Sequence, residues 1–481
     1  MLCKTNTKGK HMGHKTFKLS AVSTAMLASL MAGHASYANA EETVDETIIV
    51  TGIRGSIMRA MDTKRESTGI VDAINAEDMG KFPDTNLAES LQRITGVSID
   101  RTNGEGSKVT VRGFGPDFNV VTLNGRQMPA ANLEATTAAS TRSFDFANLA
   151  SEGVSGVQIY KTSRAEYTTG GIGSVINLET HRPLKSPGFK LSVGAKGVMD
   201  QSLEGNTITP ELSAIVSNSF FDDKVGISLV GSYQQRKSAY NAAVTGNGWY
   251  TIKGNDADWG TLPLDEYDDN GILVKEQVAV INRPTVDEVY SVPRNLSYEF
   301  NNVERERVNG QLTLQFRPVD SILATLDYTY AKNEVETNST NISAWFNNAY
   351  DTTTPGNIVM TEGTDAVGSV VAPVIYTDLS GADAASGVAS YGTYNENKSL
   401  GFNLEFTPND NLKLVLDIHS SEAEAGPADW RGSNNIIGLT QNDRIGATVD
   451  YSKDFPVLDI VYATGAEERD ASRMMSAGTS F

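Results

Sequence analysis

The chain has 481 residues and a formal net charge of −19, from 40 basic and 59 acidic side chains. This acidic balance argues against a nucleic-acid-binding protein, because a phosphate backbone attracts a basic surface. The single cysteine, Cys3, rules out a disulfide framework and a thiolate metal site, and five scattered histidines do not suggest a triad or zinc site. No metal, cofactor or catalytic group is expected, and no carboxylate pair suggests a secreted hydrolase.

Residues 1–40 have the pattern of an export signal. Five lysines begin the segment, 19–31 is a mostly apolar run, and Ala38-Asn39-Ala40 is a small-x-small cleavage site. The run is too short for a permanent transmembrane helix. The mature chain is therefore predicted to begin near Glu41, outside the inner membrane; the alternative is a cytosolic basic tail.

Residues 41–66 are charged and contain one β-branched run, Asp45-Glu46-Thr47-Ile48-Ile49-Val50. The run favours an extended backbone, and the acidic residues before it keep it soluble. An exposed strand of this kind is suited to pairing with the sheet edge of another protein. The alternative is an ordinary first strand of the domain that follows.

Residues 67–183 are predicted to form a small α/β domain. Leu87, Leu91 and Ile94 share one face of a short helix that Asp84 can cap. Asn124-Gly125 is a strong signal for a two-residue hairpin turn. Strands are expected over residues 69–74, 97–101, 108–112, 120–123, 154–161 and 174–180.

Residues 184–481 show the period-two alternation of β-strands. Leu412, Leu414, Leu416 and Ile418, for example, occupy every second position. A transmembrane barrel has this pattern, because lipid-facing and lumen-facing positions alternate. Short turns at 220–225, 316–322 and 406–412 suit one side of such a barrel, although a soluble β-sandwich would alternate similarly.

Three long polar connections, 241–302, 333–397 and 424–481, are predicted to be loops at the opposite side. All four tryptophans fall in or near them: Trp249, Trp259, Trp345 and Trp430. Aromatic rings beside amides and carboxylates suit sugar binding, so these residues and Arg126 are candidate ligand-binding residues. The alternative is that the tryptophans pack within loops or lie at the membrane interface.

Several stretches in order resemble the TonB-dependent outer-membrane receptors: residues 46–52, 87–97, 111–114, 123–126, 156–161, 165–167, 170–180 and 182–183. The resemblance implies that Asp45–Val50 is the TonB box and that residues 67–183 are a plug inside an antiparallel transmembrane β-barrel. It also implies that Arg112 pairs with barrel acids; a surface salt bridge is the alternative. A Gram-negative outer-membrane location is implied, with a periplasmic N-terminus, extracellular loops, and TonB, lipid and a small solute as partners of a monomer.

The expected function is TonB-dependent import of a scarce solute without covalent chemistry. The plug sequence and the loop tryptophans resemble receptors associated with oligosaccharide uptake; a ferric siderophore is the alternative, and a passive porin or adhesive barrel is the second. About seven or eight strands are counted after residue 188, where the family's barrels are expected to have 22, so the barrel is expected to be incomplete here and this chain a truncated form.

Overall fold

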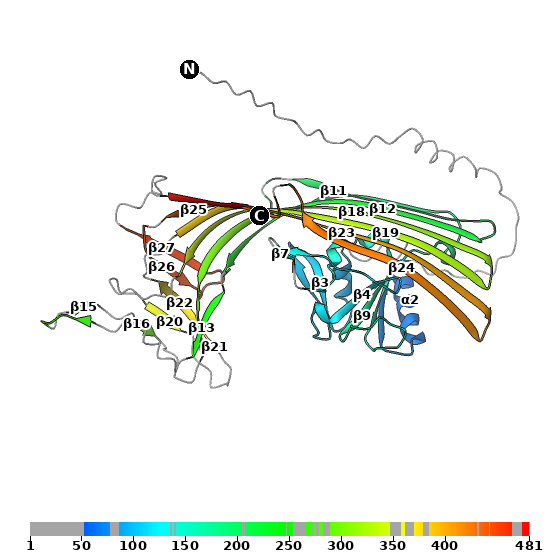
Figure 1. Ribbon diagram of the computed structural model, residues 1–481, viewed down its shortest axis with the longest axis horizontal. Coiled ribbons are helices and arrows are strands. Elements are labelled where there is room, and N and C mark those ends of the chain that lie inside the picture. The colour runs from blue at the N-terminus through cyan, green and yellow to red at the C-terminus, as the bar shows by residue number, and fades with distance from the viewer. Residues whose placement is uncertain are drawn as a thin grey trace, which may run out of the picture. The chain divides into compact units, whose positions relative to one another are not determined.

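The chain builds a small mixed domain from short elements, followed by a large sheet of long strands (Figure 1). This computed structural model describes residues 52–76, 86–134, 137–138, 141–203, 205, 207–246, 248–253, 266–270, 273–275, 279–281, 289–346, 357–360, 370–378, 384–430, 432–441, 443–463 and 474–480. The predicted signal peptide, Asp45–Val50, Asp84 and Trp259 lie outside these residues. Within the described part of the chain, no helix has the length and apolar composition needed to cross a membrane.

The N-terminal domain is organised around a five-stranded sheet in the order β1-β8-β9-β4-β5. β4 and β9 are parallel and the other neighbours antiparallel. Alternate residues such as Val157, Ile176 and Leu178 are fully buried in one apolar core, which also includes Leu87 and Leu91. The strands are β1 (Val71–Asn75), β4 (Asn119–Leu123), β5 (Arg126–Gln127), β8 (Val154–Tyr160) and β9 (Ser174–Thr180).

The predicted helix and turn of this domain are confirmed with local differences. Helix α3 (Leu87–Leu91) is short and is capped by Asn86, whose side chain accepts a hydrogen bond from the backbone N–H of Ala88 at 2.8 Å. Asn124 and Gly125 connect β4 to β5 with φ angles of 54° and 85°, the left-handed conformation that this hairpin turn requires.

A second hairpin and several short elements complete the N-terminal domain. β2 (Val97–Thr102) and β3 (Glu105–Val111) pair across a turn at Asn103-Gly104, where both φ angles are again positive. The remaining elements are η1 (Pro116–Phe118), β6 (Leu133–Glu134), β7 (Thr137–Ala138), η2 (Phe146–Asn148), η3 (Ser151–Gly153) and η4 (Pro183–Lys185).

Helix α2 (Gly52–Glu66) was not predicted, because residues 41–66 were interpreted as a charged segment with one extended run. It packs against β1. Arg59 donates to the carbonyl oxygen of Ala76 at 2.7 Å, and Lys64 pairs with Asp72. The folded block therefore begins before residue 67, and its first helix directly follows the predicted TonB box.

The large sheet contains nine antiparallel strands among the described residues, where the alternation predicted seven or eight. The long strands run side by side in Figure 1, and β24 and β25 both pair with β23. The strands are β10 (Lys190–Met199), β11 (Ile208–Phe220), β12 (Val225–Val244), β18 (Asn295–Val319), β19 (Ile322–Trp345), β23 (Ala384–Asn409), β24 (Leu412–Pro427), β25 (Asn434–Gln441) and β28 (Met474–Ser480).

The three predicted short turns are confirmed, because Phe220 pairs with Val225, Val319 with Ile322, and Asn409 with Leu412. The loop boundaries at the other side were wrong. β18, β19 and β23 run on into the predicted loops, and residues 424–481 contain further strands. The ends of these strands away from the short turns carry mostly polar side chains on both faces. The alternation of apolar residues therefore could not reveal these strand ends.

The two faces of the large sheet have opposite chemistry. The inner face, which contacts the N-terminal domain, buries polar side chains such as Gln311, Thr313 and Gln315. The outer face leaves large apolar side chains exposed, including Phe316 at 52% and Ile418 at 60%. A soluble sandwich buries its apolar face, whereas a membrane barrel presents it to lipid, so this arrangement is that of a barrel wall.

Beyond the long strands, the connecting segments form small sheets of their own. Val292, Leu296, Phe346, Tyr376 and Val449 make a second apolar core there. The strands are β13 (Trp249–Lys253), β14 (Glu266–Tyr267), β15 (Leu273–Lys275), β16 (Ala279–Ile281), β17 (Val289–Pro293), β20 (Asn357–Met360), β21 (Val370–Val371), β22 (Pro373–Asp378), β26 (Arg444–Asp450) and β27 (Val457–Tyr462).

Candidate functional site

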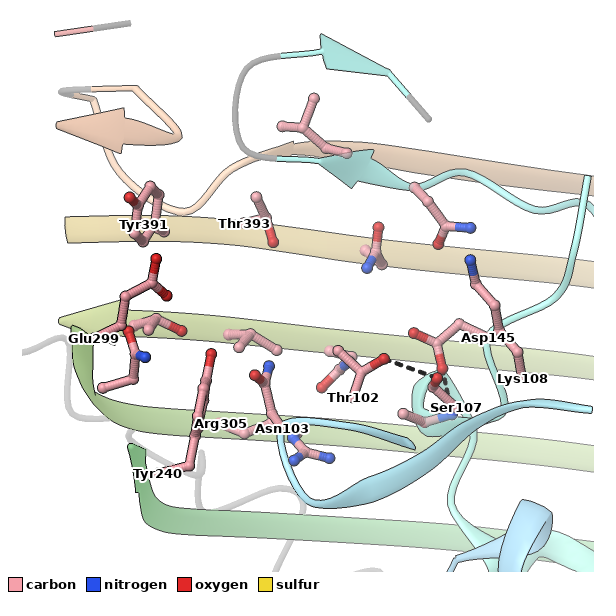
Figure 2. Close-up of a pocket in the computed structure, with 18 residues that line it drawn as sticks. Thr102, Asn103, Ser107, Lys108, Asp145, Tyr240, Glu299, Arg305, Tyr391 and Thr393 are labelled. Atoms are coloured by element: carbon pink, nitrogen blue, oxygen red, sulfur yellow. Dashed lines mark hydrogen bonds between the residues drawn. The ribbon is translucent and has the colours of Figure 1, made fainter. Parts of the chain in front are cut away.

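A cavity of about 470 Å³ lies between the N-terminal domain and the inner face of the large sheet (Figure 2). The N-terminal domain contributes the end of the β2–β3 hairpin and residues around η2. The large sheet contributes side chains from β12, β18, β19 and β23. The lining includes Thr102, Asn103, Lys108, Asp145, Tyr240, Glu299, Asn301, Arg305, Asn333, Thr337, Tyr391, Thr393 and Asn395.

The outer face of the sheet shows at which level this cavity lies. Near the short turns that face is apolar, with Leu400 exposed at 47% and Leu326 at 40%. Further along the same strands, charged pairs replace the apolar side chains: Lys332 with Glu334 on β19, and Lys398 with Glu396 on β23. Asn333 and Asn395 alternate with these charged residues, so the cavity lies at the level where the apolar band has ended.

The lining is mostly uncharged and rich in hydrogen-bonding groups. Amides and hydroxyls dominate, and Lys108 and Arg305 are balanced in number by Asp145 and Glu299. Burial raises the pKa of Asp145, although it accepts a hydrogen bond from the backbone N–H of Ala147 at 2.8 Å. Such a cavity offers many hydrogen bonds without a dominant charge.

Two tyrosines lie at one end of the cavity. Figure 2 shows Tyr391 and Tyr240 near Glu299, away from Lys108 and Asp145 at the other end. Tyr240 is 43% exposed. An aromatic ring beside a carboxylate can stack on an apolar face of a solute while the carboxylate accepts its hydroxyl groups.

A charged cluster joins the N-terminal domain to the sheet beside this cavity. Glu105, which follows the Asn103-Gly104 turn, pairs with Arg236 at 2.7 Å, with Arg307 at 3.2 Å and with Arg305. Burial alone would raise the pKa of Glu105, but the three guanidiniums outweigh it and lower the pKa to about 2. The carboxylate is thus held ionised between β12 and β18.

A second charged cluster lies toward the short turns. Arg126 donates two hydrogen bonds to Asp417, at 2.7 and 2.9 Å, and two to Asp327, at 2.8 and 2.9 Å. Its side chain is 4% exposed, and Arg182 contributes a further contact to Asp327 at 3.4 Å. Arg126 and Asp417 also line a second cavity, of about 600 Å³.

The structure gives the two predicted arginines different surroundings from those expected. Arg112 is exposed, has a φ of 54°, and donates to the carbonyl oxygen of Gly173 at 2.7 Å within its own domain. The ion pairs with the large sheet that were expected of Arg112 are made by Arg126, which had been predicted to bind ligand. A guanidinium paired with two carboxylates is suited to anchor the plug, and the ligand contact expected of Arg126 stays a prediction.

The described tryptophans do not line the cavity. Trp430 is 90% exposed, in the excursion between β24 and β25, and Trp345 is 46% exposed at the end of β19. Trp249 is 40% exposed and its ring centroid lies 5.6 Å from that of Tyr451. Their part in ligand binding stays a prediction. The sequence analysis did not identify the tyrosines and amides of the cavity. The only signal for them was that they occupy inward-facing alternate positions on long strands.

Residues 63–175 match the family described as the TonB-dependent Receptor Plug Domain. The N-terminal domain is therefore similar to the plug domain of TonB-dependent receptors. With the long-stranded sheet against it, this match supports a TonB-dependent receptor with the fold of a β-barrel and a plug. The resemblance seen in the sequence is confirmed to that extent.

Solved receptors resemble the chain more distantly. The siderophore receptor PirA from Acinetobacter baumannii has 11% identity over 82% of this chain and 60% of its own, with a TM-score of 0.32. The ferric citrate transporter FecA has 14% identity over 87% of this chain and 64% of its own, with a TM-score of 0.33. The alcaligin outer-membrane receptor FauA from Bordetella pertussis has 12% identity over 80% of this chain and 62% of its own, with a TM-score of 0.30. The chain thus spans about three-fifths of their length, and similarity at this level says nothing about its solute.

Proposed function

We propose that this protein is an outer-membrane receptor that imports a neutral oligosaccharide with energy supplied through TonB. The observation that carries the proposal is the cavity between plug and sheet, which is lined by amides, hydroxyls and two tyrosines, with opposite charges in equal number. Ferric siderophores are the alternative. Their anionic chelating groups favour a site with excess positive charge, which this lining does not provide.

The shape of the cavity supports a linear solute. Its lining extends along β23 from Tyr391 to Asn395 and along β18 from Glu299 to Arg305. At a rise of about 3.3 Å per residue, these spans correspond to about 13 and 20 Å. A row of several sugar rings fits such a length, with ring faces against the tyrosines and hydroxyls toward the amides.

The two charged clusters support an active importer over a passive porin. Glu105 ties the plug to β12 and β18, and Arg126 ties it to Asp327 and Asp417. Removing one member of a buried pair costs about 3–5 kcal/mol, so a plug held at both ends does not move aside unaided. The segment Asp45–Val50, which precedes helix α2, is proposed as the strand that TonB pairs with to supply that work.

Transport by cells that carry the gene tests this proposal. Ile49→Pro removes a backbone donor from the predicted box and blocks strand pairing, while Ile49→Val preserves it. Uptake of labelled cellopentaose, xylopentaose or maltopentaose is expected to need the gene, to be lost in Ile49→Pro and to persist in Ile49→Val. Uptake unchanged by Ile49→Pro contradicts the TonB step, and uptake of a ferric siderophore instead of any sugar contradicts the substrate class.

A further inference from the structure

Two asparagines stand opposite one another in the cavity wall. Asn333 of β19 and Asn395 of β23 are direct partners in the antiparallel register, and both line the cavity. Cross-strand partners have Cβ atoms about 4.5–5.5 Å apart, so their amides are neighbours. Asn333 is 3% exposed.

Both amides keep an acceptor without a partner. Among the described residues, the Oδ1 atoms of Asn333 and Asn395 accept no hydrogen bond from the protein. The Nδ2 atom of Asn301, another cavity residue that is only 4% exposed, likewise donates to none. Buried polar groups are normally paired, because an unsatisfied one costs free energy. Two acceptors and one donor in the cavity wall are therefore left without a protein partner.

The plug fixes the direction of one of these amides. The Nδ2 atom of Asn333 donates to Oδ1 of Asn148 at 3.1 Å, and Asn148 is 3% exposed at the end of η2. With its donor engaged by the plug, the amide of Asn333 presents its remaining acceptor. Asn148 is thus a positioning residue, and it links the cavity wall to the plug.

We propose that Asn333 and Asn395 form a hydroxyl-binding subsite, in which their Oδ1 atoms accept hydrogen bonds from two nearby hydroxyl groups and Asn301 donates to a third oxygen. The ligand class is a neutral polyhydroxylated solute. An anionic chelator presents deprotonated oxygens, which cannot donate to amide carbonyls and are repelled by them. This inference deepens the proposed function and rests on it for the identity of the solute.

Calorimetric titration of the full chain in detergent with cellopentaose, xylopentaose and maltopentaose tests the subsite. Asn395→Leu removes the acceptor at similar volume and is expected to weaken binding about tenfold, or about 1.4 kcal/mol. Asn395→Asp retains acceptor oxygens and is expected to bind within about threefold of the wild type. Asn397→Leu is the matched control, because Asn397 lies on the same strand and face with its own unpaired Oδ1 but does not line the cavity.

The positioning part is tested in the same way at Asn148. Asn148→Ala is expected to lower the affinity several-fold because the amide of Asn333 loses its orientation, and Asn148→Asp, which retains the acceptor, is expected to restore it. A purely structural role for Asn148 would change the melting temperature of Asn148→Ala without this rescue of affinity.

A crystal soaked in glucose separates the subsite from the proposed function. Hydroxyl density within hydrogen-bond distance of both Oδ1 atoms supports the subsite, even if no pentasaccharide binds and the proposed substrate falls. Pentasaccharide binding that Asn395→Leu leaves unchanged overturns the subsite while the import proposal stands. An empty subsite in the soak, together with no sugar binding, overturns both.

Discussion

The guanidinium of Arg126 lies against the backbone of Gly401, in a space that a Cβ atom at residue 401 would occupy. Asp327, the register partner of Gly401, and Asp417 of the next strand hold the guanidinium there. Three neighbouring strands of the large sheet thus form one binding position for the side chain of Arg126. Glycine at 401 is required by this close approach and not by its backbone angles.

Gly401→Ala is therefore expected to displace Arg126 and leave two carboxylates without their cation. The expected loss is about 3 kcal/mol in the free energy of unfolding, because a buried ion pair is broken. Thermal unfolding of the purified chain measures it. Gly310→Ala is the matched control, because a Cβ there meets no atom within 4 Å. Equal melting temperatures for the two variants would contradict the proposed contact between Arg126 and Gly401.

Glu105→Gln is expected to destabilise the plug end beside the cavity by about 3 kcal/mol, since it leaves three guanidiniums facing one another without the carboxylate. Glu89→Gln provides the comparison. Glu89 pairs with Arg101 at 2.6 Å on the surface, where an ion pair contributes at most about 1 kcal/mol. Denaturant unfolding of both variants checks the difference, and a cost for Glu105→Gln no larger than that for Glu89→Gln would argue against a structural role for the cluster.

Acid is expected to weaken the junction between plug and barrel through His181. Burial, together with the nearby charge of Lys190, lowers the pKa of His181 to about 4. An unfolded histidine has a pKa of about 6.5, so the folded state is fully favoured above pH 6.5 and loses this stability as the pH falls toward 4. The expected loss is about 2 kcal/mol, allowing for partial exposure. His181→Asn should flatten the stability profile over this range; an unchanged slope would contradict the assignment.

The tryptophans outside the cavity are expected to separate into packing and exposed residues. Trp249→Ala should cost about 1–2 kcal/mol of stability, because it removes an aromatic pair with Tyr451. Trp430→Ala should change stability by less than about 0.5 kcal/mol, since its side chain is 90% exposed. Differential scanning fluorimetry checks both. If Trp430→Ala weakens sugar binding without changing stability, the ligand contact predicted from the sequence is supported.

The local chemistry of turns was readable from the chain. Asn124-Gly125 indicated a hairpin, and the same dipeptide at Asn103-Gly104 carried an equally good signal that was not used. The period-two pattern located the parts of the strands whose outer face is apolar. It stopped where both faces became polar, which is why the ends of β19 and β23 were taken for loops.

Patterns among neighbouring residues were enough to predict the alternation of outward apolar and inward polar side chains, the tight turns, and the order of motifs that matches a plug. Which charged groups and amides contact one another depends on the folded arrangement. Arg126 finds its carboxylates 201 and 291 residues away, and Asn333 meets Asn148 across 185 residues. These long-range contacts depend on the strand register and on the position of the plug against the sheet. A periodic pattern along the sequence does not encode them.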